Sequence, residues 1–360
     1  MCARICVERS RRPVAKPVGV TRIPGEHMSR IAARVAVLCR ASAPGDDVRY
    51  PSCAAPQPAV THSRRATLVA TLLGASFSTF SVVTAPARGA VVITPDAAPA
   101  SSLLASASGD ARLEEVQRLF DTALATPSVE EEEAAWTACV EKLRPLTGTT
   151  DWAQPLLAGV LGNRGNARSR QGKLEAAVAD YDAAIAAAPY AIDPVLNRGV
   201  VREQLGQFEL AIEDYNAVLA VSPADPAAWN NRGNARMGLR DFAGAEGDYR
   251  TAARLAPSFA FASANLAVAQ FALGQTREAM RAMRALLRRY PSFPDVRAAL
   301  AAALWASGDT AAAESEWLRV DDPRYRDAGW VRTNRRWPPV LAEALDALVN
   351  IRATAQPTAA

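Results

Sequence analysis

Histidine is nearly absent from this sequence, and both histidines stand near its beginning. Of 360 residues only two are histidine, His27 and His62. The rest of the chain therefore cannot form a Ser-His or Cys-His nucleophile pair or a histidine-containing metal site. It also has no glycine-rich phosphate loop and no metal-ligand spacing. We predict no catalytic residue, no metal and no cofactor; catalysis by a carboxylate is the remaining enzymatic alternative.

Cysteine is scarce and divided in the same way. Cys2, Cys6, Cys39 and Cys53 precede residue 60, and only Cys139 lies beyond it. A single cysteine has no partner within its own chain, so removal of the N-terminal segment would exclude an intrachain disulfide.

The excess of positive charge also belongs to the N-terminal segment. Residues 1–90 contain 13 Lys and Arg against 4 Asp and Glu, whereas the remaining residues contain 28 against 33. The main part of the chain is therefore mildly acidic, which predicts that it does not bind nucleic acid.

Residues 1–60 have the composition of a targeting segment. They are rich in arginine and poor in acidic residues, with scattered Ser, Ala and Pro and no sustained periodicity. This composition predicts an organellar transit peptide. We interpret it as a chloroplast transit peptide, with mitochondrial targeting as the alternative.

Residues 61–87 have the layout of an export signal. Arg64 and Arg65 precede an apolar stretch at 66–83, and small residues follow up to Ala87. A twin arginine before an apolar core is compatible with Tat-type export. Behind a transit peptide, this order resembles the presequence of thylakoid-lumen proteins and predicts cleavage near Ala87. The alternative is that 66–83 is retained as a membrane anchor; residues 88–109 are predicted to be a disordered linker.

The main part of the chain repeats with a period of 34 residues. A unit of this length cannot bury its apolar face alone and must stack on its neighbours, so the sequence predicts a solenoid with an extended concave surface. The recurring columns are Pro155, Pro189, Pro223, Pro257 and Pro291; Asn163, Asn197, Asn231 and Asn265; Gly165, Gly199, Gly233 and Ala267; Ala177, Ala211, Ala245, Ala279 and Ala313; and Tyr181, Tyr215 and Tyr249.

Each unit is predicted to contain two helices. In residues 158–191 the first helix ends at a turn containing Gly172, and a second helix begins near Leu174 and stops before Pro189. In the third unit Arg240 occupies the column of that turn glycine. The same pattern applies to residues 192–225, 226–259 and 260–293, and in degenerate form to 294–327.

This spacing and these columns resemble the tetratricopeptide repeat (TPR) family. The resemblance implies an all-α, right-handed solenoid of antiparallel helix pairs. Before the repeats, residues 110–157 are predicted to form helices, with a degenerate repeat as one interpretation. After them, residues 328–352 are predicted to form a Trp/Arg-rich segment and a capping helix, and 353–360 a tail. The apolar residues of that helix are Val340, Leu341, Ala344, Leu345 and Leu348.

Two charged columns depart from the usual family pattern. An arginine stands where the family normally has a large apolar residue, and an aspartate recurs just before each tyrosine. Both charges disappear together in the fourth unit, at Leu266 and Ala282. A half-buried arginine needs a carboxylate, so we predict structural ion pairs within each unit. The pairs are Arg164 with Asp180, Arg198 with Asp214, and Arg232 with Asp248.

The resemblance implies a ligand surface along the first helices, because TPR ligands commonly lie on the concave face. Amide side chains suit the backbone of an extended peptide; the alternative is that they join neighbouring helices. Some family members bind a C-terminal carboxylate with cationic residues, but Gly162, Ala227 and Asn231 occupy those positions, which argues against chaperone tails. The predicted partner-binding residues are Asn163, Asn166, Arg170, Asn197, Asn230, Asn231 and Asn234.

Two further groups are candidates for secondary contacts. A stripe of arginines on the second helix of the fourth unit is either a solvated face or a contact for an acidic partner or an anionic lipid surface. The Trp/Arg-rich segment could bind a partner or fold back and close the end of the solenoid. The residues are Arg277, Arg281, Arg284 and Arg288 in the stripe, and Trp330, Arg336 and Trp337 in the segment.

A short terminal motif extends the resemblance. Repeats that end in Arg336-Trp337-Pro338-Pro339, behind a lumen-type presequence, are similar to plant and algal chloroplast-lumen TPR proteins. That resemblance implies a non-enzymatic scaffold of the thylakoid lumen that binds a protein or extended peptide, in assembly or maintenance of photosynthetic complexes. A membrane-tethered chloroplast adaptor is the alternative. Membrane association would be peripheral, and the sequence does not indicate an oligomeric state.

Overall fold

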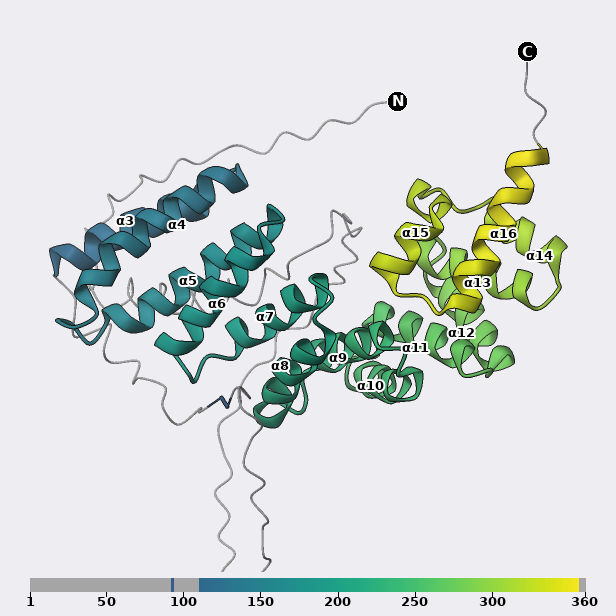
Figure 1. Ribbon diagram of the computed structural model, residues 1–360, viewed down its shortest axis with the longest axis horizontal. Helices are drawn as coiled ribbons and strands as arrows, with labels where there is room; N and C mark the ends of the chain where they lie inside the picture. Colours follow the sequence, from purple (N-terminus) through teal and green to yellow (C-terminus); the bar gives the residue numbers. More distant parts are fainter. Residues whose placement is uncertain (1–91, 94–109, 356–360) are drawn as a thin grey trace, which may run out of the picture.

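The computed structural model describes residues 92–93 and 110–355, and the longer of these stretches consists of helices joined by short turns and loops. The segments predicted at 1–60 and 61–87 lie outside the described residues, as does most of the linker predicted at 88–109. Within the described part there is no strand, and the helices stack side by side in a curved row from α3 to α16 (Figure 1). The solenoid predicted from the 34-residue period, and the all-α architecture implied by the TPR resemblance, are confirmed.

Twelve of the described helices form six consecutive pairs, each packed against the next. The Pro ladder marks their ends: Pro189, Pro223, Pro257 and Pro291 each stand two residues beyond a second helix, where a missing N–H cannot continue it. Pro155 instead lies in the first turn of its helix. The pairs are α3 (Ala111–Ala125) with α4 (Val129–Leu143), α5 (Ala153–Arg170) with α6 (Leu174–Ala187), α7 (Ile192–Gln204) with α8 (Phe208–Val221), α9 (Pro226–Gly238) with α10 (Phe242–Leu255), α11 (Ala260–Ala272) with α12 (Thr276–Arg289), and α13 (Pro294–Ala306) with the shorter α14 (Thr310–Trp317).

Short elements follow the last pair before the chain ends in a long helix. These are η3 (Pro323–Arg326), α15 (Ala328–Trp330) and the π-helical η4 (Val331–Arg335), and they lead into α16 (Pro339–Ala355). A further short element, η2 (Arg144–Leu146), follows α4. Helix α16 packs chiefly against α13 and buries Leu341, Leu345 and Leu348 completely.

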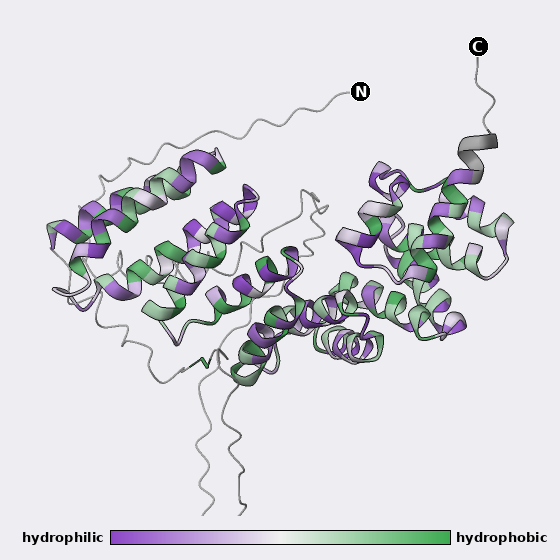
Figure 2. Cartoon of the chain, in the orientation of Figure 1, coloured by the Kyte–Doolittle hydropathy of each residue, from purple (hydrophilic) through white to green (hydrophobic). Residues whose placement is uncertain are grey.

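Hydrophobic and hydrophilic residues alternate along the helix pairs (Figure 2), as amphipathic helices in a stack require.

Two predictions about burial differ from the structure. Val340, expected on the buried face of α16, is 45% exposed. Conversely, Ile93, which lies in the segment predicted to be a disordered linker, is buried and packs with Val195 and Leu219.

The turn between the two helices of a pair requires a left-handed residue. Gly172, Gly206, Gly274 and Gly308 supply it with φ between 74° and 85°, a region that glycine enters without steric cost. In the third repeat Arg240 itself takes that conformation, with φ 60°. Gly238, two residues earlier, has a different role: a Cβ there would lie 2.6 Å from the Phe208 ring.

Small residues on the first helices make room for tyrosine rings on the second helices. A Cβ built on Gly165, Gly199 or Gly233 would lie 2.8, 2.7 and 2.7 Å from Cε1 of the tyrosine in the same pair. These rings, Tyr181, Tyr215 and Tyr249, are almost completely buried. The glycine column therefore permits the close contact between the two helices in these three pairs.

Every one of the three predicted Arg–Asp pairs is present, and each aspartate receives a second arginine one turn along the first helix. The guanidinium of the predicted partner binds both carboxylate oxygens, a planar geometry that suits arginine. The shortest N–O distances are 2.6 Å for Arg164–Asp180, 2.6 Å for Arg198–Asp214 and 2.7 Å for Arg232–Asp248; the second arginines, Arg168, Arg202 and Arg236, lie 2.9, 2.9 and 3.0 Å from the same aspartates.

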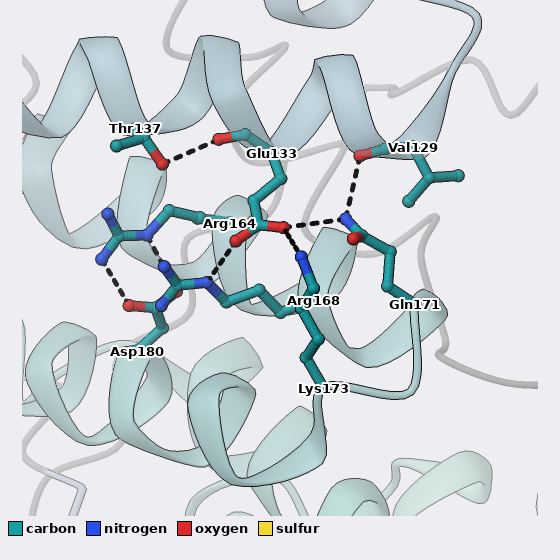
Figure 3. A network of polar contacts seen from close by, with 8 residues as sticks. All are labelled: Val129, Glu133, Thr137, Arg164, Arg168, Gln171, Lys173 and Asp180. Carbon is teal, nitrogen blue, oxygen red and sulfur yellow. Dashed lines mark hydrogen bonds and ion pairs between the residues drawn. The ribbon is translucent and has the colours of Figure 1, made fainter.

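In the first of these clusters the network extends to the N-terminal helix pair (Figure 3). Arg168 lies between Asp180 and Glu133 of α4, 2.9 Å from a carboxylate oxygen of each. Glu133 also binds Lys173 at 2.6 Å and accepts a hydrogen bond from Gln171. Lys173, with these neighbours, lowers the pKa of Glu133 to about 2. Helices α3 and α4 are thus joined to the repeats as part of one stack.

Replacing Gly199 with alanine should destabilise the protein, because the added methyl group would overlap the Tyr215 ring. We expect a loss of about 1–3 kcal/mol in the free energy of unfolding, measured by urea denaturation. The matched control is Gly162→Ala in α5, where the nearest atom to a new Cβ is 4.0 Å away. That variant should be neutral or stabilised by up to about 1 kcal/mol; equal destabilisation of both would contradict the role assigned to the glycine column.

Removing the charge of Asp214 should be far more damaging than removing that of Asp182, although both bind Arg198. The Asp214 side chain is 1% exposed and serves two arginines, whereas Asp182 is 52% exposed. We expect Asp214→Asn to cost about 3–5 kcal/mol, since it leaves the Arg202 guanidinium without a carboxylate and the buried Arg198 with only the exposed Asp182. Asp182→Asn should cost about 1 kcal/mol or less. Similar midpoints for the two variants in urea denaturation would refute this distinction.

Candidate protein-interaction surface

The predicted partner-binding asparagines lie on the first helices, and several of them are hydrogen-bonded to asparagines of the neighbouring repeat. Asn197 of α7 donates to Asn166 Oδ1 of α5 at 3.1 Å, and the Tyr181 hydroxyl donates to the same oxygen at 2.7 Å. Further along, Asn265 donates to Asn230 and Asn234 at 3.1 and 3.3 Å. These side-chain amides connect the first helices of neighbouring repeats.

The seven predicted partner-binding residues therefore do not form one exposed row. Asn163, Asn166, Asn197 and Asn230 are buried, and among the described residues Asn163 Nδ2 has no hydrogen-bond partner. Asn231 and Asn234 are half-buried. Arg170 is exposed, and its guanidinium lies 2.5 Å from Glu132 of α4. Of the seven, Asn231 and Asn234 are partly exposed, whereas the exposed Arg170 is already paired with Glu132. The role of Asn231 and Asn234 in binding stays a prediction.

The Trp/Arg-rich segment folds back over the first helices of the repeats, whose shared side we call the inner face. The Tyr325 hydroxyl donates to Asp295 Oδ1 at 2.7 Å, and Arg335 Nε donates to the same oxygen at 3.0 Å. Trp337 is 5% exposed and borders a small cavity with Asn265 and Asp295, so it lies beside the last member of the asparagine column. Burial raises the pKa of Tyr325 far above its ordinary value. This segment covers the inner face at α11 and α13.

Arg336, in the same segment, contacts the second repeat. Its guanidinium lies 2.5 Å from Glu203 Oε1 at the end of α7 and 5.4 Å from the centre of the Phe208 ring. Glu203 also accepts a hydrogen bond from the Tyr215 hydroxyl at 3.0 Å. Burial raises the pKa of Glu203, and the Arg336 charge opposes that shift. The contact joins residues 133 positions apart in the sequence.

The residues proposed for secondary contacts differ in accessibility. Trp337 is buried and Arg336 is engaged with Glu203, so both hold the segment in place. Trp330 is half-buried, with the Arg324 guanidinium 5.1 Å from its ring centre. The stripe on α12, formed by Arg277, Arg281, Arg284 and Arg288, is exposed.

Sequence reasoning missed the residues that anchor this segment, chiefly Glu203, Asp295 and Arg335. A signal for Glu203 was available in its column, because the equivalent positions in the other repeats are Ser, Met, Phe and Trp. An acidic residue at an otherwise mostly apolar position indicates a partner from outside the repeat. Nothing in the periodic pattern identifies that partner as Arg336.

In the described part of the chain, no group of three or more His, Cys, Asp or Glu residues is arranged to hold a metal ion. No helix in the same residues combines the length and apolarity needed to cross a membrane.

Comparison with known proteins supports the repeat architecture. Family models described as tetratricopeptide repeat match residues 158–190 and 264–323, and one described as TPR repeat matches 202–239. No relative among curated proteins matches this chain.

Solved structures give the same fold. A tetratricopeptide repeat protein from Parabacteroides merdae is 20% identical, with a TM-score of 0.51, over 67% of this chain and 100% of that one. The first TPR domain of human RPAP3 is 30% identical over 34% of this chain and 95% of its own, with a TM-score of 0.33. The first TPR of Spaghetti (RPAP3), solved with the HSP90 peptide SRMEEVD, is 31% identical over 32% and 93%, with a TM-score of 0.32.

Sequence and fold agree. The 34-residue columns, the stacked helix pairs and the three family matches lead to one conclusion. The chain contains tetratricopeptide repeats, matched at residues 158–190, 202–239 and 264–323.

Proposed function

We propose that this protein is a non-enzymatic scaffold that binds a polypeptide partner in the thylakoid lumen of a chloroplast. The observation that carries the binding function is the curved stack of helix pairs, whose first helices line an extended surface. The related RPAP3 domain solved with an HSP90 peptide supports a peptide or protein as the ligand class. Gly162, Ala227 and Asn231 in place of cationic residues argue against a chaperone C-terminus as that ligand.

The fold-back of the C-terminal segment limits where a partner could lie on the inner face. Trp337 and its neighbours cover α11 and α13, whereas Asn231 of α9 keeps part of its side chain accessible. We therefore propose that the partner contacts the inner face from α5 to α9. A role in assembly or maintenance of photosynthetic complexes is proposed from the lumen-type presequence and the family alone.

A partner held on the inner face should be lost when Asn231 is replaced. The full chain would be expressed with a tag in its own cells, cross-linked in isolated thylakoids and recovered, with bound proteins quantified. We expect Asn231→Ala to lower recovery several-fold and Arg284→Gln, on the exposed face of α12, to leave it unchanged. Equal recovery by both variants would move the site off the inner face, and no specific recovery by the wild type would contradict the scaffold function.

The proposed location makes a separate prediction about the N-terminus. If the export signal is cleaved after Ala87, the mature protein begins near Arg88, and its intact mass should show this start. A mature chain that still contains residues 66–83 would instead establish the membrane-tethered adaptor. A chain found in mitochondria would refute the chloroplast assignment.

A further inference from the structure

Two arginines in the described residues have an unusual backbone. Arg240 and Arg336 have φ 60° and 50°, and no other non-glycine residue described has a positive φ. The left-handed region is unfavourable for a residue with a Cβ. At the equivalent turn the second, fourth and fifth repeats use Gly206, Gly274 and Gly308. Strained residues of this kind are concentrated at functional sites, which makes their location informative.

Both strained arginines line the same hollow. It has a volume of about 390 Å³ and lies where the turn between α9 and α10 meets the C-terminal segment. The repeats contribute one wall and the segment from Arg332 to Glu343 the other, so the hollow exists only because the chain folds back. Its apolar lining is Phe208, Met237, Phe242, Trp337, Pro338 and Pro339.

The charge at this hollow is predominantly positive. Arg240 and Arg332 are exposed, and within the described part of the chain their guanidinium groups make no ion pair or hydrogen bond. Arg336 adds a third guanidinium, which Glu203 neutralises. Glu343 is the one acidic residue in the lining. Two free guanidinium groups beside aromatic and proline side chains form a surface that suits carboxylates next to a large apolar side chain.

We propose that this hollow binds an acidic segment of a partner polypeptide, with an aromatic or large aliphatic side chain inserted between Phe242 and Trp337. Carboxylates of the segment would pair with Arg240 and Arg332. Charge favours an external partner over the chain's own ends: residues 1–90 are strongly basic, and residues 353–360 contain no acidic side chain. The inference rests on the proposed scaffold function and names a second contact for its partner, outside the asparagine column.

The test uses direct binding of a defined probe to the purified protein. The probe is the unlabelled peptide Gly-Glu-Phe-Glu-Asp-Leu-Glu-Gly, with acetylated and amidated ends so that all its carboxylates are side chains, and its binding is measured by isothermal titration calorimetry. Its charge control has Gln and Asn in place of Glu and Asp. We expect saturable binding of the acidic peptide that weakens with added salt, and at least about tenfold weaker binding of the control, or roughly 1.4 kcal/mol.

Matched variants locate the site. Arg240→Gly restores the residue used in the other turns and should fold at least as well as the wild type, as checked by urea denaturation. Combined with Arg332→Gln, it should weaken peptide binding about tenfold or more. The control is Arg277→Gln/Arg284→Gln, which removes the same number of exposed charges from α12. Full binding by the hollow variant, an equal loss in the α12 variant, or no binding by the wild type would each overturn the proposal.

These outcomes are separable from the scaffold function itself. If the wild type recovers partners from thylakoids but the acidic peptide fails to bind, the hollow is excluded while the scaffold function stands. If no partner is recovered, the scaffold function fails whatever the peptide does.

Discussion

The structure depends on the close contact between the two helices of each pair. In the first three repeats a glycine on the first helix lies against a buried tyrosine ring of the second, and beside it a buried aspartate binds two arginines of the first helix. The two contacts require each other. Close approach removes the carboxylate from water, and burial is tolerable only because the guanidinium groups replace the lost hydration. A larger residue in the glycine column would disturb both.

The stack then extends through contacts between pairs. Amides such as Asn166 and Asn197 connect first helices, and Glu133 carries the ion-pair network from the first repeat into α4. These polar contacts are directional, so they fix how one pair sits on the next more strictly than apolar packing alone. The same contacts occupy the side chains that sequence reasoning assigned to a ligand.

Much of this arrangement could be predicted from the sequence because it is periodic. The proline ladder gave the ends of the second helices, and the joint loss of charge at Leu266 and Ala282 indicated that arginine and aspartate pair within a repeat. The positions that could not be predicted are those outside the period. Arg336 reaches a different repeat, and the burial of Asn166 depends on its neighbours in space. The left-handed Arg240 was visible as a departure in the glycine column, but its association with Arg336 in one hollow requires the fold-back.

That fold-back alters the mechanics of the whole solenoid. In an ordinary repeat array each unit touches only the next, so the ends can fray one at a time. Here the segment after α14 binds Asp295 in the fifth repeat and Glu203 in the second. These two contacts connect the second repeat directly to the C-terminal end of the stack. The C-terminal end cannot unfold without first breaking its contact with the second repeat, so the second to fifth repeats are coupled into one cooperative unit. The same contact restrains the elastic extension that open solenoids allow.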